Sequence, residues 1–184
     1  MPSPRSSLAL VFPLLLLAHA ARAEVTTSAA HRLVVEHKLT STVAPAALFR
    51  AIGQVGKWWN SQHTFSGSAA NLSLRVDAGG CFCERWKQGS VEHGRVILVK
   101  RDQVVQIATA MGPLMDLGVT GVLTFELKAR PAEGGQAAGT DLAVTYKVGG
   151  DPGSALTALA GPVDTVIGEQ AARLVKFAQT GKPD

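Results

Sequence analysis

Six strand-like runs followed by one amphipathic helical segment constrain the fold of this chain more than any other feature. Apolar and polar residues alternate along the runs, as at Leu142, Val144, Tyr146 and Val148 of the last one. Polar or glycine-rich separators can reverse the chain between antiparallel neighbours. The pattern predicts an antiparallel meander with one dry face, built from residues 72–77, 81–87, 91–100, 103–111, 118–129 and 140–148.

A further strand and a short helix are predicted before these runs. Residues 32–42 alternate in the same way and predict a half-buried antiparallel strand. Pro45 then stands where the first turn of a helix tolerates a missing N–H, and apolar residues follow at helical spacing until Gly53. We expect a helix over residues 45–54.

The C-terminal segment has the pattern of an amphipathic helix that covers the dry face of the sheet. Its apolar residues recur at spacings of three and four: Leu156, Leu159, Val163, Ile167, Ala171, Leu174 and Phe177. Pro162 cannot donate to the helical ladder, so either the helix starts there or an earlier turn joins it at a kink. Gly181 is expected to end it.

Residues 1–23 have the layout of a secretory signal peptide. Arg5 precedes an apolar stretch over residues 8–17, and a small-residue site predicts cleavage after Ala23, with cleavage after Ala20 as the alternative. The apolar stretch is shorter than the roughly 20 residues that cross a bilayer, so we expect no stable membrane insertion, although an uncleaved anchor is the competing interpretation. The expected location is secreted or periplasmic.

Residues 24–184 have the length of one domain with a substantial core. The formal net charge of the whole chain is +4, and removal of Arg5 and Arg22 with the leader nearly balances it. Lys and Arg are scattered singly, without a basic stripe interleaved with aromatic residues. This distribution excludes a nucleic-acid partner.

The order of these elements resembles the helix-grip fold of the START-like superfamily, also called SRPBCC. Residues 45–52, the pair Trp58 and Trp59, and residues 79–84 resemble its polyketide-cyclase and chaperone-ATPase-activator-like branch. The resemblance implies an α+β domain in which a curved antiparallel sheet grips the last helix around a ligand cavity. Members of the superfamily range from lipid carriers to cyclases. Chaperone-ATPase activation is disfavoured because an export signal separates the protein from a cytosolic chaperone.

On that architecture, strand parity and loop position nominate residues for the cavity wall. Residues two apart in a strand share a face, so Phe82, Glu84 and Trp86 point together toward the cavity. The apolar and aromatic candidates have ordinary core packing as their alternative role. The ligand-binding candidates are Trp59, His63, Phe82, Glu84, Trp86, Met111, Met115, Phe125, Leu159 and Val163.

Glu84 is the sharpest polar candidate, because a carboxylate on a buried face must be paired, hydrogen-bonded or neutralised. It is the best candidate for a general acid or base, with His63 or His93 assisting. The alternative is a structural bond or solvation at the strand end, with Arg85, Arg95, Trp58 or Trp59 as partners. The spacing of these residues does not define a complete set of catalytic groups, and no motif indicates a cofactor.

Cys81 and Cys83 are the two cysteines of the chain. A disulfide between them is disfavoured, because residues two apart on a regular strand are separated by about 6.7 Å whereas bridged Cβ atoms lie about 3.8 Å apart. A bulge or a distorted strand would be needed. With His63 or His93 the thiols could chelate a metal, but the spacing falls short of a zinc signature and we predict no metal site. Two free, partly buried thiols are the favoured interpretation, and an intermolecular bridge stays open.

Two functions follow from these expectations. The first is an exported, non-catalytic domain that binds a hydrophobic or amphipathic small molecule between the sheet and the last helix. The second is a small enzyme of the cyclase or dehydratase kind that uses Glu84 as general acid or base. The sequence favours the first function and identifies no protein partner.

Overall fold

The computed structural model describes residues 22–133 and 138–184. It contains one antiparallel eight-stranded sheet in the order β1-β2-β8-β7-β6-β5-β4-β3. The strands are β1 (Arg22–Ala29), β2 (Arg32–Ser41), β3 (Leu72–Leu74), β4 (Cys81–Trp86), β5 (Gly89–Lys100), β6 (Val104–Thr109), β7 (Thr120–Arg130) and β8 (Gly139–Gly149). The helices are α1 (Pro45–Gly53), α2 (Val55–Trp58) and α3 (Ala160–Thr180), and the 3-10 turns are η1 (Ser61–His63), η2 (Ala69–Asn71), η3 (Gly112–Leu117), η4 (Pro152–Ser154) and η5 (Leu156–Leu159).

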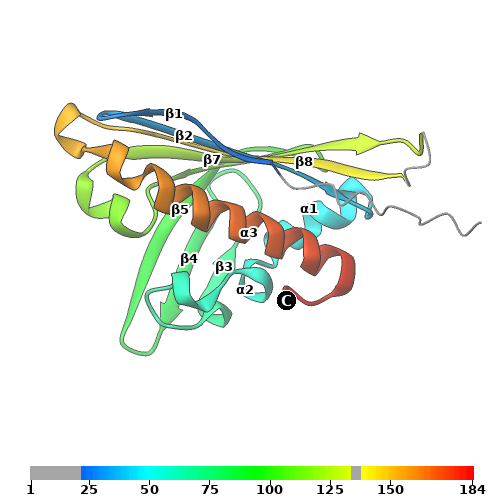
Figure 1. The fold of residues 1–184 in the computed structure, drawn as a ribbon. Helices are drawn as coiled ribbons and strands as arrows, with labels where there is room; N and C mark the ends of the chain where they lie inside the picture. Colours follow the sequence, from blue (N-terminus) through cyan, green and yellow to red (C-terminus); the bar gives the residue numbers. More distant parts are fainter. Residues whose placement is uncertain (1–21, 134–137) are drawn as a thin grey trace, which may run out of the picture.

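The sheet curves around α3, and α1 and α2 both lie against that helix (Figure 1). This arrangement is the α+β helix-grip fold expected from the sequence. The predicted strands between residues 32 and 148 all form, and α1 spans nearly the predicted residues. The predicted leader lies mainly in residues 1–21, which are outside the described residues.

β1, which pairs with β2 at the edge of the sheet, was not predicted from the sequence. Its register shifts between Val25 and Thr27, so the regular alternation that identifies a half-buried strand is broken there. The predicted cleavage point after Ala23 falls within this strand. The strand predicted over residues 72–77 ends at Leu74, and Gly80 N–H donates to the Asp77 carbonyl in the turn before β4.

The structure explains the proline near the start of the last helix. α3 begins at Ala160, so Pro162 stands in its first turn, where the amide hydrogen of a residue has no partner within the helix. Leu156 and Leu159 belong to the preceding turn η5 and continue the apolar stripe of the helix toward the sheet. The periodicity assigned both leucines correctly to the apolar face, but they precede the first residue of the helix.

α3 approaches β2 closely where a glycine removes the side chain. A Cβ atom at Gly168 would lie 2.5 Å from Cε1 of the buried His37 ring. His37 Nε2 also lies 2.9 Å from a carboxylate oxygen of Asp164, one turn earlier on the helix. The close approach and this contact fix the helix against the sheet, above a core that contains Leu33, Ile52 and Leu174.

Among residues 22–133 and 138–184, no helix combines the length and the apolar character that a membrane crossing requires.

Candidate functional site

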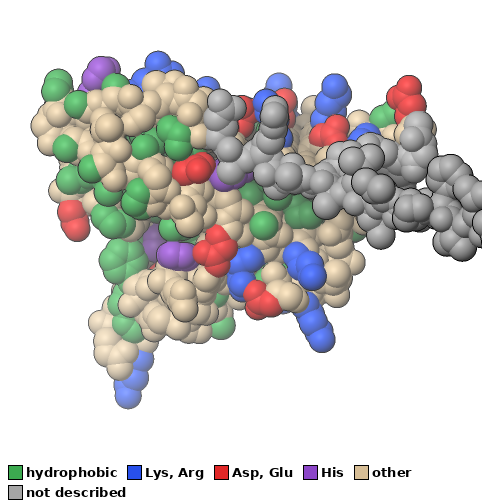
Figure 2. Space-filling view, in the orientation of Figure 1, with side chains coloured by type: hydrophobic (Ala, Val, Ile, Leu, Met, Phe, Trp, Pro, Cys, Tyr) green, Lys and Arg blue, Asp and Glu red, His purple; other side chains and the backbone are tan. Residues whose placement is uncertain are grey.

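A cavity of about 580 Å³ lies between the sheet, the first half of α3, the turn η3 and the segment that follows α2. Figure 2 shows hydrophobic side chains gathered at the left end of the molecule, around the start of α3, with a histidine beside an acidic side chain below the helix. The cavity walls are mainly apolar and aromatic. They are formed by Trp59, Gln62, His63, Thr64, Phe65, Leu72, Phe82, His93, Met111, Gly112, Pro113, Leu114, Asp116, Tyr146, Leu159, Pro162, Val163, Val166 and Ile167.

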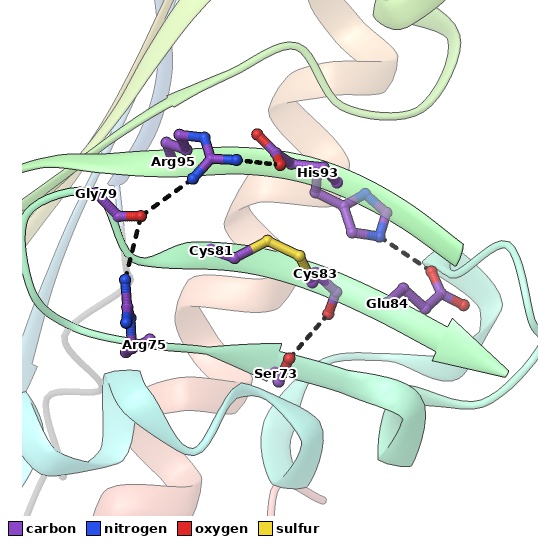
Figure 3. The surroundings of a disulfide bond; sticks show 9 residues. Ser73, Arg75, Gly79, Cys81, Cys83, Glu84, His93 and Arg95 are labelled. Carbon is purple, nitrogen blue, oxygen red and sulfur yellow. Dashed lines mark hydrogen bonds and ion pairs between the residues drawn. A yellow bond between two sulfur atoms is a disulfide. The ribbon is translucent and has the colours of Figure 1, made fainter. Parts of the chain in front are cut away.

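A buried carboxylate and imidazole stand at the sheet side of this cavity. Glu84 on β4 is 0% exposed, and its Oε2 lies 3.0 Å from Nε2 of His93 on β5 (Figure 3). The same carboxylate accepts hydrogen bonds from the backbone N–H groups of Phe65, at 3.1 Å, and Ser66, at 2.5 Å. None of the structural partners proposed from the sequence binds Glu84.

These contacts decide the charge of Glu84. Burial of the carboxyl opposes ionisation, but the hydrogen bonds from Ser66, Phe65 and His93 outweigh it and hold the pKa of Glu84 below its usual value of 4.5. Glu84 is therefore an ionised acceptor at neutral pH. It does not line the cavity, and both of its oxygens are already engaged by protein donors.

A β-bulge brings His93 into the cavity wall. Phe82 of β4 is opposite Gly94 and Cys83 is opposite Glu92, so His93 is the extra residue of β5 at this register shift. Its ring lies against Phe82, with ring centroids 5.0 Å apart, and near Phe65, at 5.8 Å. Its backbone carbonyl accepts a hydrogen bond from Thr109 Oγ1 at 2.6 Å. The imidazole is thus held in one position.

Tyr146, the one tyrosine of the chain, forms another part of the wall. Its hydroxyl donates to the carbonyl of Thr109, at 3.1 Å, and accepts from the N–H of Met111, at 3.3 Å. Burial raises the pKa of Tyr146 to about 12, against a small opposing effect of the Met111 hydrogen bond. The phenol stays neutral at physiological pH and ties β8 to the rim of the cavity.

The cavity mouth is closed on one side by the segment after α2, tied to α3 by polar contacts. Asn60 N–H donates to Gln170 Oε1 at 2.8 Å, and its side-chain amide donates to Glu169. His63 Nε2 lies 3.1 Å from the other Glu169 oxygen. Trp59 Nε1 donates to the carbonyl of His63 at 2.9 Å. These bonds hold Trp59 and His63 at the cavity.

Several residues predicted from the sequence line this cavity: Trp59, His63, Phe82, Met111, Leu159 and Val163. The others lie elsewhere. Glu84 stands behind His93 and Phe65, and Phe125 packs in the core farther along the sheet. Trp86 packs over Gly89 in the turn between β4 and β5, and Met115 is 40% exposed on the outer side of η3.

The lining residues that sequence reasoning missed come mainly from loops. Gln62, Thr64, Phe65, Pro113 and Asp116 lie in segments where no periodicity assigns a side chain to a face. His93 was named as a companion of Glu84, but strand parity alone does not place an extra residue at a bulge. Tyr146 was recognisable from its alternation with Val144 and Val148, which share its face.

The structure corrects the expectation for the cysteines, because Cys81 and Cys83 form a disulfide (Figure 3). Their Cα atoms are 5.4 Å apart, shorter than the spacing on a regular strand, at the register shift between Phe82 and Cys83. β4 is therefore contracted at the cysteines, opposite the bulge on β5. The favoured interpretation, two free thiols, was wrong.

The sulfur atoms do not meet either histidine that was considered as a metal ligand. The described residue that clusters with them is Glu92, with the candidate ligand atoms all within 4.8 Å. Glu92 pairs with Arg95 at 2.6 Å, and the joined sulfurs offer no thiolate. The disulfide faces away from the cavity, since Cys81 and Cys83 have the opposite parity to Phe82 and Glu84.

Comparisons with known proteins support the fold. The sequence matches no protein-family model and no curated protein. Among solved structures, protein MLL2253 from Mesorhizobium loti is 18% identical, with a TM-score of 0.52 over 78% of this chain and 96% of that one. A protein from Rhodobacter sphaeroides is 20% identical, with a TM-score of 0.51 over 83% and 95% of the two chains. Protein EF2215 of unknown function from Enterococcus faecalis is 8% identical, with a TM-score of 0.53 over 88% and 78%.

Proposed function

We propose that this protein binds a hydrophobic or amphipathic small molecule in the cavity between the sheet and α3, as an exported member of the START-like superfamily. The observation that carries the proposal is the cavity of about 580 Å³ itself. This volume lies within the range of small-molecule sites, which are mostly apolar with a few placed polar groups. The helix-grip architecture and the leader-like residues 1–23 support the assignment and the export.

The distribution of polar groups supports a carrier role. Around Met111, Leu159 and Val163 the wall is apolar, and the hydroxyl of Tyr146 is occupied by protein partners. A ligand would gain free energy from burial of apolar surface, about 25 cal/mol per Å² removed from water before the entropy cost of binding. Such a site needs no chemical step.

A cavity-filling variant tests the proposal. In Val163→Trp an indole occupies the cavity, and in the control Ala172→Trp the same residue is added on the exposed face of α3. We expect the wild type and Ala172→Trp to bind the apolar dye anilinonaphthalene sulfonate alike, and Val163→Trp to bind it at least tenfold more weakly with a native unfolding transition. Equal binding by all three proteins would contradict the proposal.

Native mass spectrometry of protein purified gently from an exporting host provides the second test. We expect a co-purifying small molecule in the wild type that is absent from Val163→Trp. A folded wild-type protein that carries no molecule and takes up no apolar dye would contradict the carrier function.

A second candidate is a small enzyme of the cyclase or dehydratase kind, favoured by the contact between Glu84 and His93. Because both Glu84 oxygens are engaged, proton transfer would fall to His93, with Glu84 as its positioning residue. Incubation of the recovered molecule with fresh protein distinguishes the two functions. A carrier returns the molecule at unchanged mass and structure, whereas an enzyme converts it.

A further inference from the structure

His93 is a buried imidazole in the cavity wall, and its neighbours decide which ring nitrogen carries the hydrogen. Glu84 is ionised and accepts two backbone N–H groups, so it can only accept from His93 as well. Nε2, which lies 3.0 Å from Glu84, is therefore the nitrogen that carries the hydrogen in the tautomer that these contacts select. This tautomer leaves Nδ1 with a lone pair, and Nδ1 becomes a hydrogen-bond acceptor.

Nδ1 of His93 has no partner within the described part of the chain. His93 is 7% exposed and lines the cavity, yet no described residue forms a hydrogen bond with its Nδ1. Nδ1 nevertheless keeps some accessible surface, so it is not sealed inside the protein. Nδ1 is therefore a buried acceptor that reaches the cavity space.

The other polar side chains of the wall are committed or lie at the mouth. Tyr146 is bonded to the backbone on both sides, Thr64 Oγ1 donates to Ser61 at 2.7 Å, and His63 is paired with Glu169. Gln62 and Asp116 are exposed. Within the described wall, Nδ1 is thus the one buried side-chain acceptor that forms no hydrogen bond with the protein.

We propose that His93 Nδ1 is the polar anchor of the cavity, and that the ligand is an apolar, ring-containing molecule with a neutral hydroxyl group that donates a hydrogen bond to it. This inference rests on the proposed function, since it assumes a ligand in the cavity. Phe65 and Phe82 lie beside the His93 ring and Trp59 lies beside Phe82, so aromatic surface for a ring adjoins the anchor. A carboxylate is disfavoured because Glu84 already places one negative charge behind the same imidazole.

A set of matched probes tests the anchor in the intact protein. Naphthol has the hydroxyl donor, its methyl ether has the same ring without the donor, and naphthoate has a negative charge instead. By titration calorimetry at neutral pH we expect naphthol to bind the wild type about tenfold more tightly than the ether, the value of one buried hydrogen bond, and naphthoate to bind more weakly than naphthol.

His93→Gln separates the anchor from the structural role of the imidazole. A glutamine amide can still donate to Glu84 through Nε2, but its acceptor oxygen is bonded to Cδ and leaves the position of Nδ1 empty. We expect this variant to bind the ether as the wild type does and to bind naphthol with the same affinity as the ether. A retained tenfold preference in a folded His93→Gln protein would overturn the assignment to His93.

The wild-type protein supplies a readout that does not depend on the variant. Naphthol is expected to shift the nitrogen NMR signal of His93 Nδ1 in the direction of an accepted hydrogen bond, and the ether is expected to leave it in place. If naphthol and ether bind equally well without this shift, the anchor is wrong and cavity binding stands. If no probe binds, the proposed function fails with it.

Discussion

The contacts of Glu84 show how one buried charge is stabilised. Its carboxylate is removed from water but accepts three hydrogen bonds, two of them from the loop amides of Phe65 and Ser66. A buried carboxylate with such partners costs far less than an unpaired one. Strand parity predicted that Glu84 points inward. It could not predict the loop amides, because they belong to residues that are brought to Glu84 only by the tertiary fold.

Acid is expected to destabilise the protein through Glu84. Its pKa is lowered from 4.5 in the folded state, so the unfolded chain binds more protons between the two pKa values. The stabilisation by Glu84 is present above about pH 4.5 and is lost as the pH falls through the folded pKa. Urea unfolding at a series of pH values is expected to show this loss in the wild type. It is expected to be absent in Glu84→Gln, which lacks the titrating group.

The same variant is expected to lower the free energy of unfolding at neutral pH by about 2–4 kcal/mol, because the glutamine amide would set one of its N–H groups against a protein donor. Glu92→Gln, an exposed carboxylate on the neighbouring strand, provides the control, with an expected change below about 1 kcal/mol. A Glu84→Gln protein with wild-type stability and an unchanged acid transition would contradict a structural carboxylate.

Among the elements, the hairpin of β4 and β5 departs most from what a periodic sequence predicts. Its strands were predicted nearly to their ends, since alternation and turn residues are local signals. The register shift at Phe82 and Cys83 was not predicted, because a bulge depends on how two strands pair. That shift accounts for the inward position of His93, and the cysteines linked by the disulfide lie opposite it on β4.

The disulfide is expected to be detectable by alkylation of the unfolded protein. Without reductant, mass spectrometry is expected to show no alkylated cysteine, and with reductant both Cys81 and Cys83 are expected to react. Because the bridge closes a very short loop, its reduction is expected to cost no more than about 2 kcal/mol of stability. Equal alkylation with and without reductant would contradict the bridge.

The packing of α3 on β2 depends on Gly168. A methyl group at this position would press on the His37 ring, which is buried and lies 2.9 Å from Asp164. Gly168→Ala is expected to lower the free energy of unfolding by about 1–3 kcal/mol, as overpacking does. The measurement is urea unfolding monitored by circular dichroism.

Gly161→Ala is the matched control for that substitution. A Cβ atom at Gly161, on the same helix, meets nothing within 4 Å. We expect its stability to be unchanged or raised by up to about 1 kcal/mol, since alanine favours the helix. Similar losses in both variants would mean that the contact with His37 does not limit the packing.

At the scale of the whole molecule, the order of strands and helices was sufficient to predict the helix-grip fold. A long run of antiparallel strands has one dry face, and the last helix supplies the matching apolar stripe. The full cavity wall was less predictable, because it combines the sheet, α3 and loops. Leu159 and Val163 were identified by helical periodicity, whereas Phe65 and Asp116 come from segments without a repeating pattern.

Residues 59–66, here called the portal segment, connect the two halves of this architecture. Glu169 of α3 holds its first part through Asn60 and His63, and Glu84 of β4 holds Phe65 and Ser66. Because Trp59 and Phe65 line the cavity, a ligand that enters beside them needs this segment to move. The contacts with Glu169 are partly exposed and are the weaker of the two attachments.

Glu169→Ala is therefore expected to speed ligand exchange with little effect on stability. Loss of both contacts loosens the portal segment, and we expect association and dissociation of naphthol to become about three- to tenfold faster, while the free energy of unfolding changes by less than about 1 kcal/mol. Stopped-flow tryptophan fluorescence measures these rates, because Trp59 lies in the cavity wall.

Glu36→Ala provides a matched control for this effect on exchange. The Glu36 side chain is 31% exposed, against 35% for Glu169, and it pairs with Lys38 on β2 instead of with the portal segment. Its naphthol exchange rates are expected to equal those of the wild type. If Glu169→Ala exchanges naphthol no faster than Glu36→Ala, the ligand does not enter beside the portal segment, and a path past η3 at the opposite rim becomes the one to test.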